Sequence, residues 1–403
     1  MKITYLHQYF QTPDAAGGTR SFEIARELVK KGHEVNVITA NRFAEKSGWT
    51  WKTEQVAGIN IHWIDMPFTN YQGYSTRVVG FIKFAVLSFG KALSIKSDLI
   101  FATSTPLTIA IPGVLAKKIK RKPMVFEVRD LWPELPIAIG ALKAPPAIWV
   151  AKRLEKWAYK NSSAIIGLSP GMCEGIVATG VPEDKVYNIP NLSDIDRFSV
   201  EQAQGLAYLE ERGWPADTQL ILYAGTFGVI NGASYLVELA AELVNLNCKV
   251  KVLLIGDGFE KNLIENRAKE LGLLDDKVFV SSPVPKSEVP KVYSAATIVT
   301  SLFIPLKEMQ SNSANKFFDG LASGKPVMIN YGGWQANYLK EYDAGIVLQN
   351  EDYCEAAQRI NRLLHNNDRL TEIAENALKL AQKEFSRDKL VEKFIGVLEK
   401  SNN

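Results

Sequence analysis

The segment with the clearest chemical potential begins at Ser313 and reads SANKFFDGLASGKPV. Its pattern predicts a helix over residues 315–323, with Asn315 and Lys316 in the first turn. A cation there is unfavourable for the helix dipole, so a bound anion would explain the lysine. Asp319 lies one turn further on, on roughly the same face. A diphosphate beside Lys316 and a ribose diol beside Asp319 fit this spacing; an amphipathic helix with solvated side chains is the alternative.

A second candidate is the loop AAGGTR, which occupies residues 15–20 and ends in Arg20. It follows the first predicted strand and opens the first predicted helix. Gly17 and Gly18 would let a phosphate or a sugar approach the backbone, next to the free N–H groups of the helix N-terminus. The glycine spacing is not that of a dinucleotide-binding fingerprint. An ordinary strand–helix turn is the alternative.

A third candidate follows another apolar strand and reads EVRDLWPE, residues 127–134. Arg129 could hold an anion and Asp130 could orient a hydroxyl group. A surface cluster of ion pairs is the alternative. Two glycine turns, at residues 225–228 and 256–258, also follow strands and permit close approach of a ligand; a simple turn is the alternative at each.

Other catalytic classes find little support. The three cysteines are far apart, so neither a disulfide scaffold nor a zinc cluster is expected. Asp194 and Asp196 form a DxD triplet, but they lie in a linker, and no metal is expected there. Ser169 has the spacing of a nucleophile elbow in GLSPG, yet the following proline removes the N–H that an oxyanion hole needs. A hydrolase triad is therefore not expected.

The surrounding elements alternate between apolar strands and helices in two series, one before and one after a polar linker near residues 188–198. This alternation predicts an α/β fold with two doubly wound, Rossmann-like domains that face each other across a cleft. We expect an N-terminal domain over residues 1–195 and a second domain over 196–375. The helices of 376–403 are expected to pack back on the N-terminal domain. Ligands should bind in the groove between the domains.

Charge is divided unevenly between the two halves. Residues 1–195 carry a net charge of +8 and residues 196–403 carry −5, within a total of +3. Basic residues alternate with Trp149 and Trp157 over residues 149–160, and residues 117–122 hold five cations in six positions. This composition suits an anionic membrane surface. Core tryptophans with solvated lysines are the alternative, and nucleic acid is not expected because no binding motif accompanies the charge.

Taken together, these residues resemble the family 4 glycosyltransferases, retaining enzymes of GT-B fold that use nucleotide sugars. The resemblance covers nearly the whole chain and rests on four segments: the GGTR loop, the linker NIPN with DRF, the strand end LIGDG and the segment from Asp319 to Val327. The segments DLWPE and NKFFD are similar to those of bacterial enzymes that build surface polysaccharides.

The resemblance implies that the N-terminal domain is the acceptor-side domain, that residues 196–375 bind the nucleotide sugar, and that single residues have specific roles. Lys316 would be the main partner of the diphosphate, with Arg20 beside it, and Asp319 would hold the ribose. Residues 283–285, with Val284 at the centre, would line the base pocket. Thr226 and Asn231 stand where many members carry Arg and Lys, and Ser311 stands where the family usually has a glutamate. The donor-binding set that we expect is Gly17, Gly18, Arg20, Thr226, Asn231, Gly256, Val284, Asn315, Lys316 and Asp319.

The implied reaction is front-face substitution with retention, for which Lys316, Asp130 and Arg129 are the expected catalytic residues. The donor would be a UDP-sugar, without metal or other cofactor. The acceptor would be a glycan or a lipid-linked oligosaccharide, met in the cytoplasm at the inner face of the cell membrane. Arg129 stands where many members have a histidine, and an arginine could pair with a carboxylate, so a uronic acid is an alternative donor sugar. A nucleotide-sugar epimerase of the same fold and a non-catalytic nucleotide-sugar binder are the alternatives.

Overall fold

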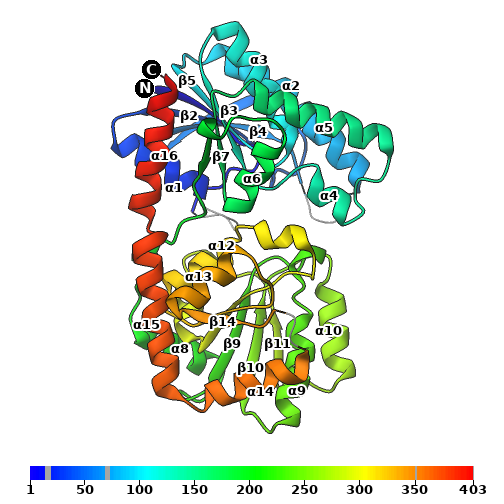
Figure 1. The fold of residues 1–403 in the computed structure, drawn as a ribbon, viewed down its shortest axis with the longest axis vertical. Coiled ribbons are helices and arrows are strands. Elements are labelled where there is room, and N and C mark those ends of the chain that lie inside the picture. Colours follow the sequence, from blue (N-terminus) through cyan, green and yellow to red (C-terminus); the bar gives the residue numbers. More distant parts are fainter. Residues whose placement is uncertain (14–19, 69–72, 350–351, 403) are drawn as a thin grey trace.

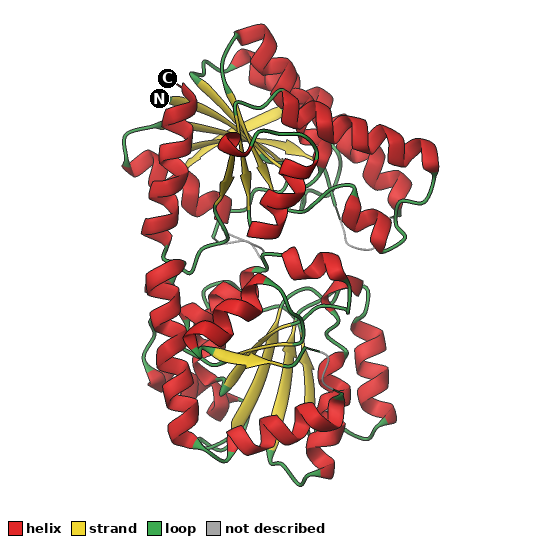
Figure 2. Ribbon diagram, viewed as in Figure 1, coloured by secondary structure: helices red, strands yellow, loops and turns green. Residues whose placement is uncertain are grey.

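The computed structural model describes residues 1–13, 20–68, 73–349 and 352–402. The chain forms two lobes, each a central sheet covered by helices on both faces (Figures 1 and 2). The expected α/β GT-B architecture is therefore confirmed. Gly17 and Gly18 lie outside the described residues.

The N-terminal lobe is built on an eight-stranded sheet in the order β3-β4-β2-β1-β5-β6-β7-β8. Its strands are β1 (Lys2–Leu6), β2 (Glu34–Asn41), β3 (Trp51–Val56), β4 (Ile59–Asp65), β5 (Leu99–Thr103), β6 (Met124–Val128), β7 (Ala164–Gly167) and β8 (Val186–Asn188). Every residue of β5, β6 and β7 is buried, as expected for parallel strands between two helical layers.

The helices of this lobe are α1 (Arg20–Lys30), α2 (Tyr74–Ser94), α3 (Ala110–Lys120), α4 (Glu134–Ala138), α5 (Pro145–Lys160) and α6 (Pro170–Ala178). The antiparallel pair β3–β4 and the helix α2 were not predicted from the sequence. β3 is mostly exposed, so it lacks the apolar run by which the buried strands were recognised.

The C-terminal lobe carries a six-stranded parallel sheet in the order β11-β10-β9-β12-β13-β14. Its strands are β9 (Gln219–Ala224), β10 (Val250–Ile255), β11 (Val278–Ser281), β12 (Ile298–Ser301), β13 (Val327–Ile329) and β14 (Gly345–Val347). Its helices are α7 (Ile195–Phe198), α8 (Gln202–Glu211), α9 (Tyr235–Asn245), α10 (Lys261–Glu270), α11 (Val289–Ala295), α12 (Asn315–Ala322), α13 (Trp334–Tyr342), α14 (Tyr353–Leu364) and α15 (Asn367–Glu384).

The chain then returns to the first lobe. Helix α15 packs on the C-terminal lobe, and α16 (Arg387–Asn402) runs along the N-terminal one (Figure 1). The ring of Phe394 in α16 meets that of Phe101 in β5 edge-on, with 4.9 Å between centroids. At the crossing point Ser193 donates its backbone N–H to the carbonyl of Phe385. Two chain crossings therefore join the lobes.

Direct contacts also close the base of the cleft. The hydroxyl of Ser169 caps α6 and donates to the carbonyl of Ser311, 2.6 Å away. Asn191 donates its side-chain amide to the Ser313 carbonyl, and the Ser193 hydroxyl donates to that of Phe318 over 3.0 Å. The segment before α12 is thus held against the other lobe by hydrogen bonds. The position of α12 at the cleft follows from these contacts.

A buried ion pair ties three parts of the N-terminal lobe together. Arg20 begins α1, and its Nε and Nη2 donate to Oε1 of Glu127 over 3.0 and 2.8 Å. Its guanidinium also donates to the carbonyls of Ile189 and Pro190 in the linker. Burial would raise the pKa of Glu127, but the neighbouring arginines outweigh it and hold that pKa below its usual value. Arg20 therefore anchors the linker to β6.

We predict that Glu127→Gln destabilises the protein by about 3–5 kcal/mol, because it leaves the buried Arg20 cation without its counter-ion. Urea denaturation followed by circular dichroism measures this change. Lys52→Gln is the control, since the Lys52 side chain is 69% exposed and its surface pair with Asp65 is worth only about 0–1 kcal/mol. Equal midpoints for the two variants would contradict a structural role for the buried pair.

Candidate functional site

Two adjoining pockets fill the cleft between the lobes. We call them the C-terminal pocket, formed at the carboxyl ends of β9, β10 and β11, and the N-terminal pocket, formed at the carboxyl ends of β1, β2, β5, β6 and β7. Four residues line both pockets: Arg42, Asn312, Ala314 and Asn315. The pockets therefore meet in front of the N-terminus of α12, where a molecule bound in one could react with a molecule bound in the other.

The C-terminal pocket brings together seven of the residues singled out from the sequence. They are Thr226, Asn231, Gly256, Val284, Asn315, Lys316 and Asp319. They come from three strand ends and from the first turns of α12, segments nearly a hundred residues apart in the chain. Arg20 lines the same pocket, but its guanidinium is engaged by Glu127 and the linker carbonyls.

Lys316 projects from the first turn of α12 toward the turn after β9. Its Nζ donates to Oδ1 of Asn231 over 3.2 Å and lies 4.8 Å from the centre of the Tyr223 ring. Burial lowers the pKa of Lys316 to about 8, although Asp319 opposes this shift. An amide and an aromatic ring compensate an ammonium only in part. The ammonium is therefore well placed for an anion.

Glycines make this placement possible. A Cβ on Gly225 would lie 3.0 Å from Cδ and 3.1 Å from Nζ of Lys316. A Cβ on Gly256 would collide with the carbonyl oxygen of Gly225, only 1.8 Å away. These strand ends are packed so closely that a side chain at either position would displace Lys316 or the backbone beside it. Close packing therefore explains why glycine occupies these two turns, in addition to the approach of a ligand that the sequence suggested.

Asp319 sits one turn deeper, within a cluster of charges. Burial raises the pKa of Asp319 to about 6, against the opposing effects of Arg197 and Lys286. Burial likewise lowers the pKa of Lys286 to about 8, and its ammonium has no hydrogen-bond partner among the described residues. Both side chains line the C-terminal pocket. Asp319 therefore offers a hydrogen-bond acceptor and Lys286 a hydrogen-bond donor to a polar ligand.

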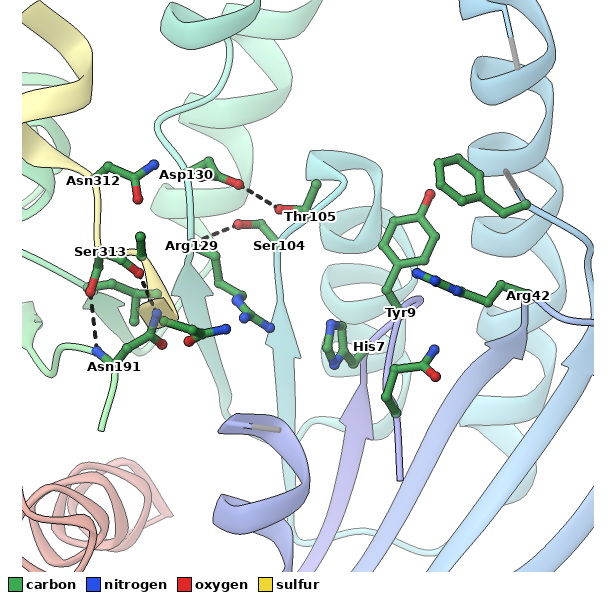
Figure 3. A pocket seen from close by; sticks show the side chains of 15 residues that line it. His7, Tyr9, Arg42, Ser104, Thr105, Arg129, Asp130, Asn191, Asn312 and Ser313 are labelled. Atoms are coloured by element: carbon green, nitrogen blue, oxygen red, sulfur yellow. Dashed lines mark hydrogen bonds between the residues drawn. The ribbon is translucent and has the colours of Figure 1, made fainter. Parts of the chain in front are cut away.

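The N-terminal pocket contains Arg129 and Asp130, directly after β6 (Figure 3). Asp130 accepts a hydrogen bond from the hydroxyl of Thr105 over 3.0 Å, and the Arg129 backbone N–H donates to the hydroxyl of Ser104. The β5–β6 pairing brings these loops side by side. Asp130 is therefore held at the cleft with its carboxylate partly available.

Several lining residues were missed by sequence reasoning. Lys286 and Arg197 face the C-terminal pocket, and His7, Tyr9 and Arg42 face the N-terminal one (Figure 3). Each of His7, Tyr9 and Arg42 follows the carboxyl end of a strand. The strand-end rule that selected Arg129 could have selected them too, but they stand in no recognisable motif.

Other predicted features have structural explanations. The carboxylates of Asp194 and Asp196 both pair with Arg387, at 2.8 and 2.5 Å. Among the described residues, no group of three or more His, Cys, Asp or Glu side chains is arranged to hold a metal ion. Ser311 lies against α6, where a Cβ on Gly171 would approach its Oγ to 2.3 Å.

Comparison with known proteins agrees with this architecture. Residues 16–192 match the model of the glycosyl transferase 4-like domain, and residues 207–380 match that of glycosyl transferases group 1. The two matches together account for most of both lobes. The chain therefore belongs to the family 4 type of GT-B glycosyltransferases.

Individual relatives are distant. The chain is 22% identical to a glycosyltransferase of Methanocaldococcus jannaschii over 93% of its own length and 91% of the relative. It is also 22% identical to spore coat protein SA of Bacillus subtilis over 45% of its length, and it spans about half (49%) of that protein. The crystal structure of Anabaena HepE in complex with UDP and glucose superposes with a TM-score of 0.73, at 18% identity, over 99% of this chain and 100% of HepE.

We predict that UDP binding is accompanied by proton uptake at pH 8–9. Because Lys316 has a pKa of about 8 in the free protein, a growing fraction is neutral above that pH, and a diphosphate would restore the proton. Affinity should fall as the pH rises through this range. Calorimetry in two buffers of different ionisation enthalpy measures the uptake.

The variant Lys316→Arg, which stays charged, should bind UDP with less proton uptake. Lys340→Arg, an exposed position on the neighbouring helix α13, is the control and should behave as the parent protein does. Undiminished uptake in Lys316→Arg would show that another group titrates.

Proposed function

We propose that this protein is a retaining, metal-independent hexosyltransferase that moves a sugar from a UDP-sugar to a glycan or a lipid-linked acceptor in polysaccharide synthesis. The observation that carries the proposal is the half-buried ammonium of Lys316, which lines the C-terminal pocket one residue after Asn315, where the two pockets meet. In a transfer of this kind, negative charge grows on the departing diphosphate. A fixed cation at that point lowers the barrier because it stabilises the transition state more than the ground state.

The residues of the C-terminal pocket suit the rest of a nucleotide sugar. The Asp319 carboxylate can accept hydrogen bonds from the ribose diol, one helical turn from the lysine. Val284 and Pro283 line the pocket beyond the end of β11 and offer an apolar wall for the base. HepE, which shares this fold, was crystallised with UDP and with UDP-glucose. We carry UDP over to this chain on that basis.

In the proposed reaction, an acceptor hydroxyl attacks the anomeric carbon from the side that the diphosphate leaves. The bond from the anomeric carbon to the diphosphate oxygen breaks as the new glycosidic bond forms, and the hydroxyl proton passes to the departing phosphate. Asp130, in the adjoining pocket, orients the acceptor hydroxyl. Arg129 supplies positive charge beside it. Closure of the lobes excludes water and so limits hydrolysis of the donor.

The acceptor side also carries a surface suited to an anionic membrane. Val78, Val79, Ile82 and Val86, at helical spacing on α2, are 52–66% exposed, and Trp149 on α5 is 61% exposed. Helix α3 contacts both α2 and α5, so the three lie together on one side of the lobe (Figure 1). Lys152, Arg153 and Lys156 follow Trp149 along α5. We therefore propose peripheral binding at the inner membrane face.

Part of the predicted basic segment has another role. Lys117 and Lys120 donate hydrogen bonds to the carbonyls of Asn161 and Ile95, the residues that directly follow helices α5 and α2. Trp157 packs against the core, with Lys118 over its ring. The proposed membrane-binding surface therefore includes fewer residues than the basic segments at 117–122 and 149–160 suggested. In the described part of the chain, no helix has the length and hydropathy needed to span a bilayer.

We predict that Lys316→Ala lowers acceptor-dependent release of UDP by about 10²–10³-fold, because the cation opposite the departing diphosphate is lost. A panel of UDP- and GDP-sugars, tested with a lipid-linked acceptor and with chelator present, measures this. Lys340→Ala is the control. Proton NMR of the product reports the anomeric configuration, which should match that of the donor.

Three results would count against the proposal in different ways. Near-normal turnover in Lys316→Ala would remove the lysine from its role. Interconversion of sugars without release of nucleotide would support an epimerase. Binding without turnover under every condition would support a nucleotide-sugar binder, the reading favoured by Ser311 at a position where the family has a glutamate.

We also predict that the variant Val79→Ser with Ile82→Ser binds vesicles containing anionic lipid several-fold more weakly, since both side chains are exposed and apolar. Co-sedimentation measures this, and added salt should weaken binding of the parent protein. Leu263→Ser, 55% exposed on α10 in the other lobe, is the control. Equal binding by the control and the double variant would rule out α2 as the contact surface.

A further inference from the structure

The N-terminal pocket holds two guanidinium groups that face the same space. Arg129 extends into it from the end of β6, and Arg42 extends into it from the end of β2 (Figure 3). Between them lies the imidazole of His7, at the end of β1. Three parallel strands of one sheet, β2 and β1 side by side and β6 on the far side of β5, thus present cationic and polar groups to one cavity.

Both guanidinia are uncommitted within the described part of the chain. No hydrogen bond or ion pair joins either of them to another described residue. Arg42 lies over the ring of Phe43, 4.7 Å from its centre, and burial lowers the pKa of Arg42. A half-buried guanidinium without a carboxylate partner is unfavourable, because its five N–H donors have lost part of their hydration.

The nearby carboxylates do not neutralise this pair. Glu127, at the end of β6, accepts hydrogen bonds from Arg20 and from the hydroxyl of Thr103; Arg129 helps to lower its pKa but forms no ion pair with it. Asp130 accepts a hydrogen bond from the hydroxyl of Thr105. Its carboxylate therefore stands on the pocket wall with two cations, Arg42 and Arg129. The lining therefore has an excess of positive charge.

Further polar atoms in the same cavity lack partners. His7 is only 4% exposed, and its Nδ1 has no hydrogen-bond partner among the described residues; the hydroxyl of Tyr9 has none either. Burial, with Arg129 nearby, holds the pKa of His7 well below its usual value, so the ring stays neutral. Buried polar atoms are ordinarily satisfied. Here an incoming ligand would satisfy them.

We propose that the N-terminal pocket binds an anionic group, a carboxylate or a phosphate, on one of the two molecules that the enzyme joins. Guanidinium groups match both anions through paired N–H donors. This inference rests on the proposed function and narrows its substrates. The anion belongs either to the transferred sugar, as the carboxylate of a uronic acid, or to the acceptor, as the phosphate that links its sugar to a lipid.

The donor arm of the test compares UDP-glucuronate with UDP-glucose, which differ at C6 by carboxylate against hydroxymethyl. The acceptor arm, run with UDP present, compares decyl diphosphate-linked N-acetylglucosamine with the neutral decyl N-acetylglucosaminide. Titration calorimetry measures the affinities, and UDP alone serves as the reference ligand. In one of the two arms we expect the anionic compound to bind about 10–100-fold more tightly than its neutral match.

Arg129→Gln and Arg42→Gln should each reduce that ratio about tenfold or more. UDP alone should bind Arg129→Gln as it binds the parent protein; because Arg42 also lines the C-terminal pocket, the ratio of Arg42→Gln is compared with the UDP affinity of the same variant. Arg129→Lys should restore part of it, since one positive charge remains. Arg362→Gln, at an exposed position on α14, is the control and should leave the ratio unchanged.

A preference in the donor arm assigns the carboxylate of the sugar, and one in the acceptor arm assigns the lipid-linked phosphate. Two outcomes would overturn the inference, provided that UDP binds normally. In the first, the anionic and neutral compounds bind equally well in both arms. In the second, Arg129→Gln and Arg42→Gln weaken the binding of the anionic and the neutral compound by the same factor. Failure of UDP to bind the parent protein would instead overturn the proposed function.

Discussion

The site depends on one electrostatic constraint: an ammonium is held among groups that neutralise it only in part. Lys316 has Asn231 and the Tyr223 ring as its contacts, with Asp319 nearby, and burial already lowers its pKa. With a pKa of about 8 the ammonium is still mostly charged at neutral pH, so it is a cation whose charge is only partly compensated and which an anion would stabilise. A diphosphate is such an anion, and its departure as a leaving group would use the same charge. The proposed activity follows from this constraint.

The fold places that charge where two substrates can meet. Parallel strands gather their carboxyl ends at one edge of each sheet, and both edges face the cleft. The segment before α12 is tied to the opposite lobe through Asn191 and Ser169, so the lysine is positioned relative to both pockets. The buried pair of Arg20 and Glu127 fixes the linker in turn. The buried ion pair and these hydrogen bonds therefore hold the residues of the candidate site in place.

The sequence predicted those parts of the molecule that local patterns determine. Buried strands such as β6 read as apolar runs, and the NKFFD helix has a clear period, so the two-lobed fold and the neighbourhood of Lys316 could be predicted. Arg20 could not be interpreted from its loop, because its partner Glu127 is 107 residues away. Arg42 and His7 belong to no motif and gain meaning only when the sheet brings β1, β2 and β6 together. Long-range pairing of this kind leaves no local signal.

The most direct test is a crystal structure of the protein with UDP. We predict that a phosphate oxygen lies about 2.7–3.2 Å from Nζ of Lys316 and that the ribose hydroxyls contact Asp319. The nucleotide would then occupy the C-terminal pocket, with its diphosphate pointing toward Arg129 and Asp130. A nucleotide bound elsewhere, or a Lys316 side chain turned to bulk solvent in the complex, would contradict the account.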